Sequence, residues 1–198
     1  VGDSGKLYKM NNGTFALADV KSGTYSLSGD EQWRFVRFGD DVIASGSDSD
    51  VLQKFTIGTS SAFSAISGAP AAKFLAVVRD FVVTANVTYS SATYRSRVRW
   101  SQINDANSWT LGTAQADFQE IADAGHITGL VGGEFGVVLL EKAIARMQYV
   151  GSPLIFTFEK VETGHGCNYP NSVTSLGPTQ VFYLADDGFF FFDGSKSI

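Results

Sequence analysis

The hydrophobic positions of the chain fall into pairs of short apolar runs, and each pair is separated by a few polar or glycine residues. Residues 34–38 and 42–44, for example, flank the turn-forming sequence Gly39-Asp40-Asp41. The other pairs are residues 74–78 and 81–83, residues 127–131 and 137–140, and residues 181–184 and 189–192. Asp and Gly tolerate the positive φ that tight hairpin turns require, so each pair predicts a β-hairpin.

The hairpins recur at a nearly regular interval. Their turns are centred at residues 40, 80, 134 and 187, so the separations are 40, 54 and 53 residues. A period of roughly 40–50 residues with several strands in each repeat is typical of β-propeller blades. The runs are also continuously apolar, most clearly Phe189-Phe190-Phe191-Phe192, which predicts strands that are covered on both faces. The pattern therefore predicts an all-β fold, a β-propeller of about four blades.

Each end of the chain supplies part of a blade. Residues 181–192 provide only two strands, and residues 6–17 predict a further hairpin around Asn11-Asn12-Gly13. We therefore expect residues 1–30 to complete the blade formed by residues 176–198, which closes a ring of four blades in a single domain spanning residues 1–198. The alternative is that the chain is part of a longer propeller protein.

Two segments contain good helix formers. Residues 114–124 are compatible with a short helix or with an irregular connection. Residues 141–147 are expected to begin with a hairpin turn at Glu141-Lys142, because the residues on both sides of that turn are typical of strands.

Composition narrows the class of protein. Hydrophobic residues make up 44% of the 198 residues, so a substantial core can form, which excludes a disordered tail. The chain has 15 basic and 20 acidic residues and a net charge of −5. Its single cysteine, Cys167, cannot form an intramolecular disulfide. No apolar stretch approaches the roughly 20 residues of a membrane-spanning helix, so we expect no membrane span.

Residue patterns for catalysis or metal binding are few. The sequence contains no nucleophile elbow (Gly-x-Ser-x-Gly), and its only histidines are His126 and His165. His165-Gly166-Cys167 offers two ligands, whereas a closed zinc site needs about four. Asp48-Ser49-Asp50 lacks the Gly and Glu of a calcium-binding EF-hand loop. We therefore expect no enzymatic activity, no catalytic residues, no cofactor and no metal site.

The most distinctive charged feature is an arginine stripe. Arg95, Arg97 and Arg99 alternate with other residues in the segment 94–100, so an extended strand places all three on one face. They either form a surface that holds a partner's phosphates or carboxylates, or they protect an edge strand from aggregation. The acidic net charge argues against a DNA-gripping domain. These arginines are the candidate partner surface.

From about Trp33 onward the chain resembles the β-propeller region of tail-nozzle proteins of short-tailed bacteriophages and of the related packaged-DNA stabilisation (head-completion) proteins. The segments that carry the resemblance are residues 76–83, residues 97–101 with Trp109, residues 127–136, residues 143–147 with Val150-Gly151, residues 170–173, and residues 187–189 with Asp193-Gly194. Proteins of this type are normally longer and continue past the point that matches Ile198, which favours the longer-propeller alternative.

The resemblance implies a structural virion protein of the phage tail, assembled in the cytoplasm of the bacterial host. Such proteins form an oligomeric ring, usually a hexamer, in the head–tail channel, where they retain packaged DNA and conduct it during ejection. It also implies contacts with other tail and adaptor proteins and a transient, non-specific proximity to DNA. An acidic wall suits such a conduit, because every neutralised phosphate would add affinity and slow the passage of the duplex.

Two other functions fit the same fold. The chain is alternatively a host-glycan-binding propeller module of a phage tail, in which exposed aromatic side chains stack on sugars; the candidates are Trp33, Tyr89, Tyr94 and Trp109. The third function is a hydrolase of sialidase type, because residues 101–110 loosely resemble the Asp-box of sialidase propellers. That activity requires two suitably separated carboxylates.

Overall fold

The computed structural model describes residues 1–21, 23–177 and 180–198. These residues form five antiparallel sheets, and their helical structure is limited to a single 3-10 turn, η1 (Pro170–Ser172). The prediction of an all-β fold is therefore confirmed. In this part of the chain no helix is long and apolar enough to cross a membrane.

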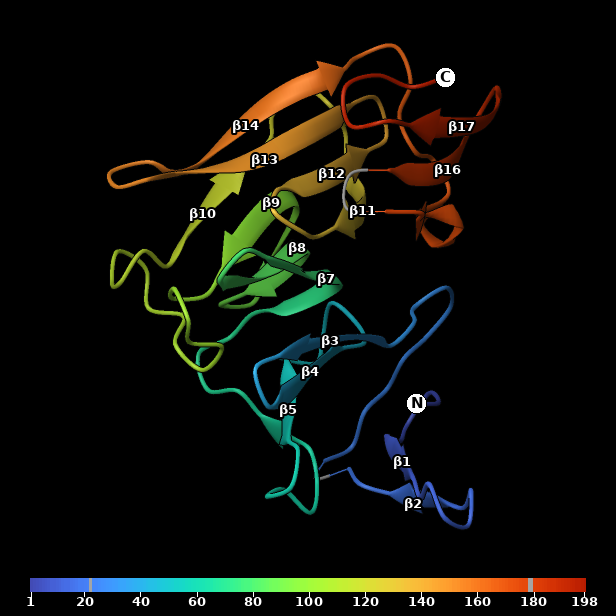
Figure 1. Cartoon of the computed structure of the whole chain (residues 1–198), viewed down its shortest axis with the longest axis vertical. Helices are drawn as coiled ribbons and strands as arrows, with labels where there is room; N and C mark the ends of the chain where they lie inside the picture. The colour runs from blue at the N-terminus through green and yellow to red at the C-terminus, as the bar shows by residue number, and fades with distance from the viewer. Residues whose placement is uncertain (22, 178–179) are drawn as a thin grey trace.

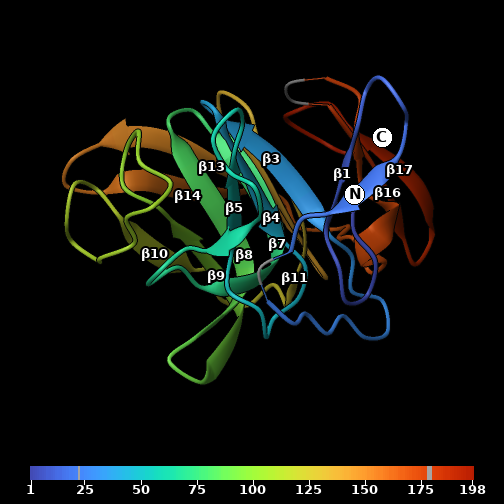
Figure 2. The same cartoon turned by 90° about the horizontal axis from the view of Figure 1, so that it is seen from below.

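The sheets follow one another along the chain (Figure 1; seen from below in Figure 2). The first is the hairpin of β1 (Tyr8–Met10) and β2 (Leu17–Asp19). Three four-stranded sheets come next. The first contains β3 (Arg34–Phe38), β4 (Asp41–Ser45), β5 (Gln53–Thr56) and β6 (Ser64–Ala65). The second contains β7 (Ala71–Val78), β8 (Phe81–Tyr89), β9 (Ala92–Trp100) and β10 (Asp117–Glu120), and the third contains β11 (Ile127–Val131), β12 (Gly136–Leu140), β13 (Ile144–Gly151) and β14 (Ile155–Glu162). The last contains β15 (Thr174–Ser175), β16 (Val181–Ala185) and β17 (Gly188–Phe192). Within every sheet neighbouring strands are consecutive in sequence, which is the up-and-down order of a propeller blade.

The hairpins expected from the sequence are all present. They are β3–β4, β7–β8, β11–β12 and β16–β17, and each pairs in the antiparallel register. Gly39 adopts a φ of 60° in the first of these turns, a conformation that glycine reaches at little cost. The turn at Glu141-Lys142 joins β12 to β13 as predicted.

Residues 114–124 do not form a helix. Instead, β10 pairs with β9 from Asp117 opposite Trp100 to Glu120 opposite Arg97. This pairing satisfies the backbone hydrogen-bonding groups at the edge of β9. Ile121, which follows β10, is buried in the core between two sheets. Tertiary pairing and burial thus override the local helix propensity of this segment.

The sheets pack face to face through separate hydrophobic clusters. The largest joins the sheet of β7–β10 to the sheet of β11–β14, where Trp100 meets Phe156 edge to face with ring centroids 5.0 Å apart. A second cluster joins the β3–β6 and β7–β10 sheets, and a third joins the β11–β14 and β15–β17 sheets. The β7–β10 sheet and the β11–β14 sheet are therefore each covered on both faces, as the continuous apolar runs predict.

The N-terminal hairpin does not complete the last sheet. In the described part of the chain β1 pairs with β2 alone, and this segment packs on the sheet that follows it in sequence. The residues of that contact are Leu7, Val20, Tyr25, Ala44, Phe55 and Phe63. The prediction that residues 1–30 complete the blade of residues 176–198 by strand pairing is therefore wrong, because the nearest uncovered apolar face is that of β4 and β5.

The fourth position of the last sheet is taken by the end of the chain itself. Ile198 exchanges two backbone hydrogen bonds of 2.9 Å with Phe191, and Ser197 forms a bridge with Phe192. The edge of β17 that the N-terminal hairpin was expected to cover is thus partly occupied by its own C-terminal residues.

We expect the free energy of unfolding to fall as the pH drops below about 4. Backbone hydrogen bonding, chiefly from Asn107, lowers the pKa of Asp105 below its usual value of 3.8. Burial raises the pKa of Glu162, but the N–H groups of Gly164 and Ser197 outweigh it and the pKa is lowered overall. A carboxyl whose pKa is lower in the folded state stabilises the fold above its unfolded pKa, and this contribution disappears as the pH falls through the folded value.

Urea unfolding at a series of acidic pH values measures this dependence. The substitution Asp105→Asn removes the titrating group and should flatten the acid limb of the curve relative to the unmodified protein. An identical pH dependence of the two proteins would contradict the assignment of Asp105.

Candidate functional site

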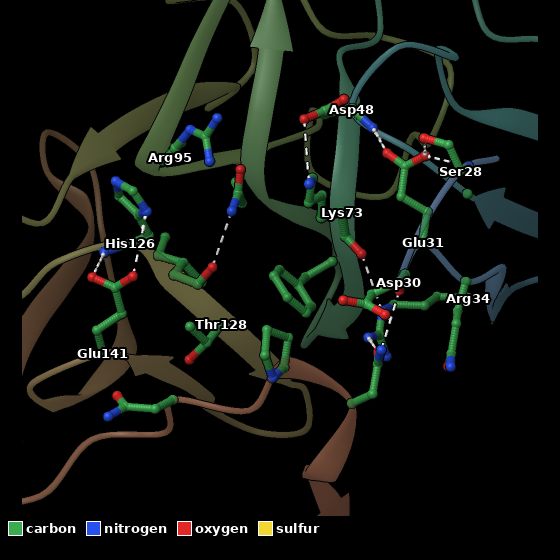
Figure 3. A pocket seen from close by; sticks show the side chains of 18 residues that line it. Ser28, Asp30, Glu31, Arg34, Asp48, Lys73, Arg95, His126, Thr128 and Glu141 are labelled. Carbon is green, nitrogen blue, oxygen red and sulfur yellow. Dashed lines mark hydrogen bonds and ion pairs between the residues drawn. The ribbon is translucent and has the colours of Figure 1, made fainter. Parts of the chain in front are cut away.

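A pocket of about 440 Å³ lies between the first strands of the successive four-stranded sheets (Figure 3). Its lining includes residues of β3 (Arg34), β7 (Lys73), β11 (Thr128) and the η1 turn (Asn171). The first strands of three successive sheets and the segment before β15 thus surround one space, the position of the axis in a propeller. We call this space the axial pocket.

The axial pocket is bounded on one side by a contact between the two ends of the fold. Asn171 accepts a hydrogen bond from Nη2 of Arg34 at 3.1 Å, and its Nδ2 donates to the backbone carbonyl of Asp30 at 3.1 Å. The sheet of β3–β6 and the segment leading to β15 therefore meet through side chains, in place of the expected strand ladder.

Several ionisable groups around the pocket contact one another. Lys73 Nζ lies 3.4 Å from Asp48 Oδ2, and Glu31 Oε1 accepts the backbone N–H of Asp48 at 3.3 Å. On the other side His126 Nδ1 lies 3.4 Å from Glu141 Oε1, while Glu141 Oε2 accepts the backbone N–H of His126 at 3.1 Å. Figure 3 shows the two groups of charged side chains facing each other across the pocket.

Arg34 is held in place between these groups. Its Nε donates to the carbonyl of Lys73 at 3.0 Å, and its guanidinium lies 4.8 Å from the centre of the Phe74 ring. Burial lowers the pKa of Arg34 below its usual 12.5, which leaves the guanidinium charged at neutral pH. Arg34 therefore has a structural role in the wall of the pocket.

The three arginines of the stripe have different environments. Arg95 is exposed and lines the axial pocket. Arg97 donates two hydrogen bonds to Glu120 Oε1, at 2.6 and 3.2 Å. Arg99 is only 2% exposed and donates from Nη2 to the carbonyl of Trp109 at 2.8 Å. The expected exposed face of three arginines is therefore wrong: Arg99 is inside, Arg97 is paired with a carboxylate, and Arg95 alone is accessible and unpaired in the described ranges.

A bulge in the sheet and a nearby aromatic ring explain this separation. The β8–β9 register jumps from Ala85 opposite Val98 to Val87 opposite Tyr94, which interrupts the regular alternation of β9. The guanidinium of Arg99 stacks 3.8 Å from the centre of the Tyr89 ring. Burial lowers the pKa of Arg99, and its interaction with Tyr89 opposes that effect. A bulge leaves no clear signal in the alternation of residue types, so the sequence pattern missed it.

The aromatic residues proposed for sugar stacking make contacts within the fold. Trp109 is 2% exposed and donates to the carbonyl of Ala106, and Trp33 donates from Nε1 to the carbonyl of Asp3 at 2.8 Å. The remaining two rings, Tyr89 and Tyr94, lie under the guanidinium groups of Arg99 and Arg97. These four side chains therefore contribute to packing.

The segment His165-Gly166-Cys167 has structural contacts. His165 Nε2 lies 3.3 Å from Asp187 Oδ2, its ring packs 4.5 Å from that of Phe190, and Cys167 is buried in the core. Within residues 1–21, 23–177 and 180–198, no three or more His, Cys, Asp and Glu side chains are grouped as metal ligands.

Comparison with known proteins shows the fold alone. No family model and no curated protein matches the sequence. Among solved structures, the dihydro-heme d1 dehydrogenase NirN in complex with DHE superposes on 98% of this chain with a TM-score of 0.60 and 14% identity. YCF48 from Cyanidioschyzon merolae superposes on 97% with a TM-score of 0.54 and 14% identity.

Both neighbours have propeller-like folds, so the sheets described above have the arrangement of propeller blades. This chain spans 41% of the NirN chain and 64% of the YCF48 chain.

Proposed function

We propose that this chain is a structural module of a bacteriophage tail nozzle, the part of the head–tail channel that retains packaged DNA and conducts it during ejection. It acts through contacts with copies of itself in a ring and with other tail proteins. The sequence resemblance supports this role, and so does the propeller-like fold. The observation that carries it is an uncovered aromatic face on the last sheet.

This face, which we call the terminal face, lies on β16 and β17. Phe182 is opposite Phe191 and Leu184 is opposite Phe189, so these four side chains share one side of the sheet. Phe189 is 70% exposed and its ring stacks on that of Phe182, with centroids 5.6 Å apart. The expectation that both faces of residues 189–192 are covered is therefore wrong on this side. The other three side chains are half-buried. An exposed aromatic ring beside partly exposed apolar side chains is typical of a protein interface.

The two ends of the stack of sheets differ. The outer face of the first four-stranded sheet is covered by the N-terminal segment, whose own hairpin exposes Met10, Phe15 and Leu17. The terminal face has no such cover in the described part of the chain. A head-to-tail contact that pairs the N-terminal hairpin of one copy with the terminal face of the next buries both surfaces, and such heterologous contacts generate rings when the rotation closes.

Sedimentation velocity over a range of protein concentrations tests this contact. We expect the unmodified protein to associate and Phe189→Ser to weaken the association at least tenfold, because it removes an exposed aromatic from the centre of the terminal face. Leu154→Ser is the matched control, since Leu154 is 67% exposed but lies between β13 and β14. Equal association by Phe189→Ser and Leu154→Ser would exclude the terminal face as the interface.

Recognition of host glycans is the second candidate function. The observation that favours it is the pair of buried acceptors without partners in the axial pocket, Oδ1 of Asn86 and Oδ1 of Asn168.

A further inference from the structure

The axial pocket contains buried hydrogen-bond acceptors that the fold leaves unused. Asn86 on β8 is 7% exposed, and its Nδ2 donates to the carbonyl of Ile127 at 3.1 Å. Its Oδ1 is buried and has no partner in the described structure, and the same holds for Oδ1 of Asn168, which also lines the pocket. A buried acceptor without a hydrogen bond destabilises the protein. A bound group with two O–H or N–H donors would satisfy both oxygens.

A cation without a partner lies beside these acceptors. The register jump of the β8–β9 bulge places Asn86 opposite residues 95–97, so Arg95 and Asn86 come from the same level of adjacent strands. Arg95 lines the same pocket and has no hydrogen bond or ion pair among the described residues. Figure 3 shows its guanidinium above His126 at the edge of the pocket, where it can bind an anionic group.

The backbone at Asn86 supports a binding role. Its φ is 54° in the middle of a strand, a left-handed conformation that asparagine adopts more readily than most residues other than glycine. Such conformations are costly and often occur at ligand sites.

The remaining charges of the pocket restrict the ligand further. Lys73 is paired with Asp48, and Arg34 donates to the Lys73 carbonyl and to Asn171. Arg95 is therefore the cation of the pocket lining that makes no hydrogen bond or ion pair among the described residues. The carboxylates of Asp30 and Glu31 lie on the opposite side of the pocket from Arg95 (Figure 3). On the side of Arg95, a ligand therefore meets one cation at the edge and two neutral acceptors, and the pocket volume of about 440 Å³ lies in the size range of small-molecule sites.

We propose that the axial pocket binds an acidic sugar. Hydroxyl groups of the ring donate to Oδ1 of Asn86 and Oδ1 of Asn168, and the carboxylate of the sugar pairs with Arg95. The sugar is either a free monosaccharide or a residue of a surface polysaccharide. This inference does not depend on the assembly role proposed above; it rests on the second candidate function, glycan recognition, and gives it a site and a class of sugar.

Titration calorimetry with D-glucuronate, D-glucose and acetate tests the chemistry. Glucose has the hydroxyls without the carboxylate and acetate has the reverse, so we expect each to bind at least tenfold more weakly than glucuronate. A hexasaccharide of glucuronate-containing repeats distinguishes the two sources: tighter binding of the hexasaccharide indicates a polysaccharide, and equal affinity indicates the free sugar. The absence of saturable binding of both glucuronate and the hexasaccharide would overturn the proposal.

Two variants assign the contacts. Arg95→Gln changes an exposed side chain and should weaken glucuronate binding at least tenfold while leaving the weak glucose binding unchanged. Asn86→Gly removes the acceptor and retains the positive φ without strain, so it should fold and lose affinity for both sugars. Arg97→Gln is the matched control, because Arg97 is already paired with Glu120. Equal losses in Arg95→Gln and Arg97→Gln, or acetate binding as tight as glucuronate binding, would reduce the site to a general anion site and overturn the proposal.

Discussion

Replacement of Trp100 by alanine should destabilise the protein by about 4 kcal/mol, within the range typical of large-to-small changes in a core. Trp100 is 2% exposed and belongs to the largest hydrophobic cluster, which joins the β7–β10 and β11–β14 sheets. Its ring contacts Phe156 edge to face and packs against Phe158 at 6.2 Å. Its Nε1 also donates to the carbonyl of Gln115 at 2.7 Å. The substitution removes the packing, the aromatic contacts and the hydrogen bond together.

Such a loss is a large fraction of the roughly 5–15 kcal/mol that stabilises a typical domain. Urea unfolding monitored by circular dichroism measures it. Tyr169→Ala is the control, because Tyr169 is 47% exposed and lies outside the sheets, so its removal should change the free energy of unfolding by less than about 0.5 kcal/mol. An equally small change in the free energy of unfolding of Trp100→Ala would show that the packing of Trp100 between the two sheets does not stabilise the protein.

The substitution Gly132→Ala should have the next largest effect, a destabilisation of about 3 kcal/mol. Gly132 lies in the β11–β12 turn, where an added Cβ would overlap the carbonyl oxygen of Val77 on β7. The two sheets are joined at this point by backbone hydrogen bonds, from Gly133 to Val77 at 3.0 Å and from Arg79 to Gly133 at 2.9 Å. Because the obstacle is backbone, relief requires the two turns to separate and the bonds to break.

Gly5→Ala is the matched control for this prediction. A Cβ at Gly5 meets the carbonyl oxygen of Tyr25 at 3.7 Å, an ordinary van der Waals contact. Hydrogen exchange of the Arg79 and Gly133 amides gives a local readout, which should accelerate in Gly132→Ala and remain unchanged in Gly5→Ala. Unchanged protection of both amides in Gly132→Ala would contradict the tight approach of the sheets.

The sequence predicts the local elements of this fold well. The hairpins at Gly39, Arg79, Gly132 and Asp187 depend on turn residues and on the apolar runs beside them, and both signals are local. The continuous apolar runs at residues 81–83 of β8 and 137–140 of β12 also indicate burial between sheets, and this burial is the basis for predicting a propeller-like arrangement.

Features that depend on contacts between distant segments were not predictable in this way. The position of β10 is decided by the free edge of β9, and the position of the N-terminal hairpin by the apolar face of β4 and β5. The arginine stripe is divided by a bulge that the alternation of residues does not reveal. The axial pocket unites side chains that lie far apart in the sequence, such as Asn86 and Asn168, and these carry no motif.

The mass of the native particle tests the proposed function most directly. Single-particle imaging or light scattering of the assembly in its source determines whether the chain is part of a ring. We expect a ring-shaped particle of several times 21.3 kDa, alone or within a larger tail assembly. A particle that remains a monomer at every concentration, and that is absent from tail assemblies, would contradict the proposal that this propeller-like chain is a structural component of a phage tail nozzle.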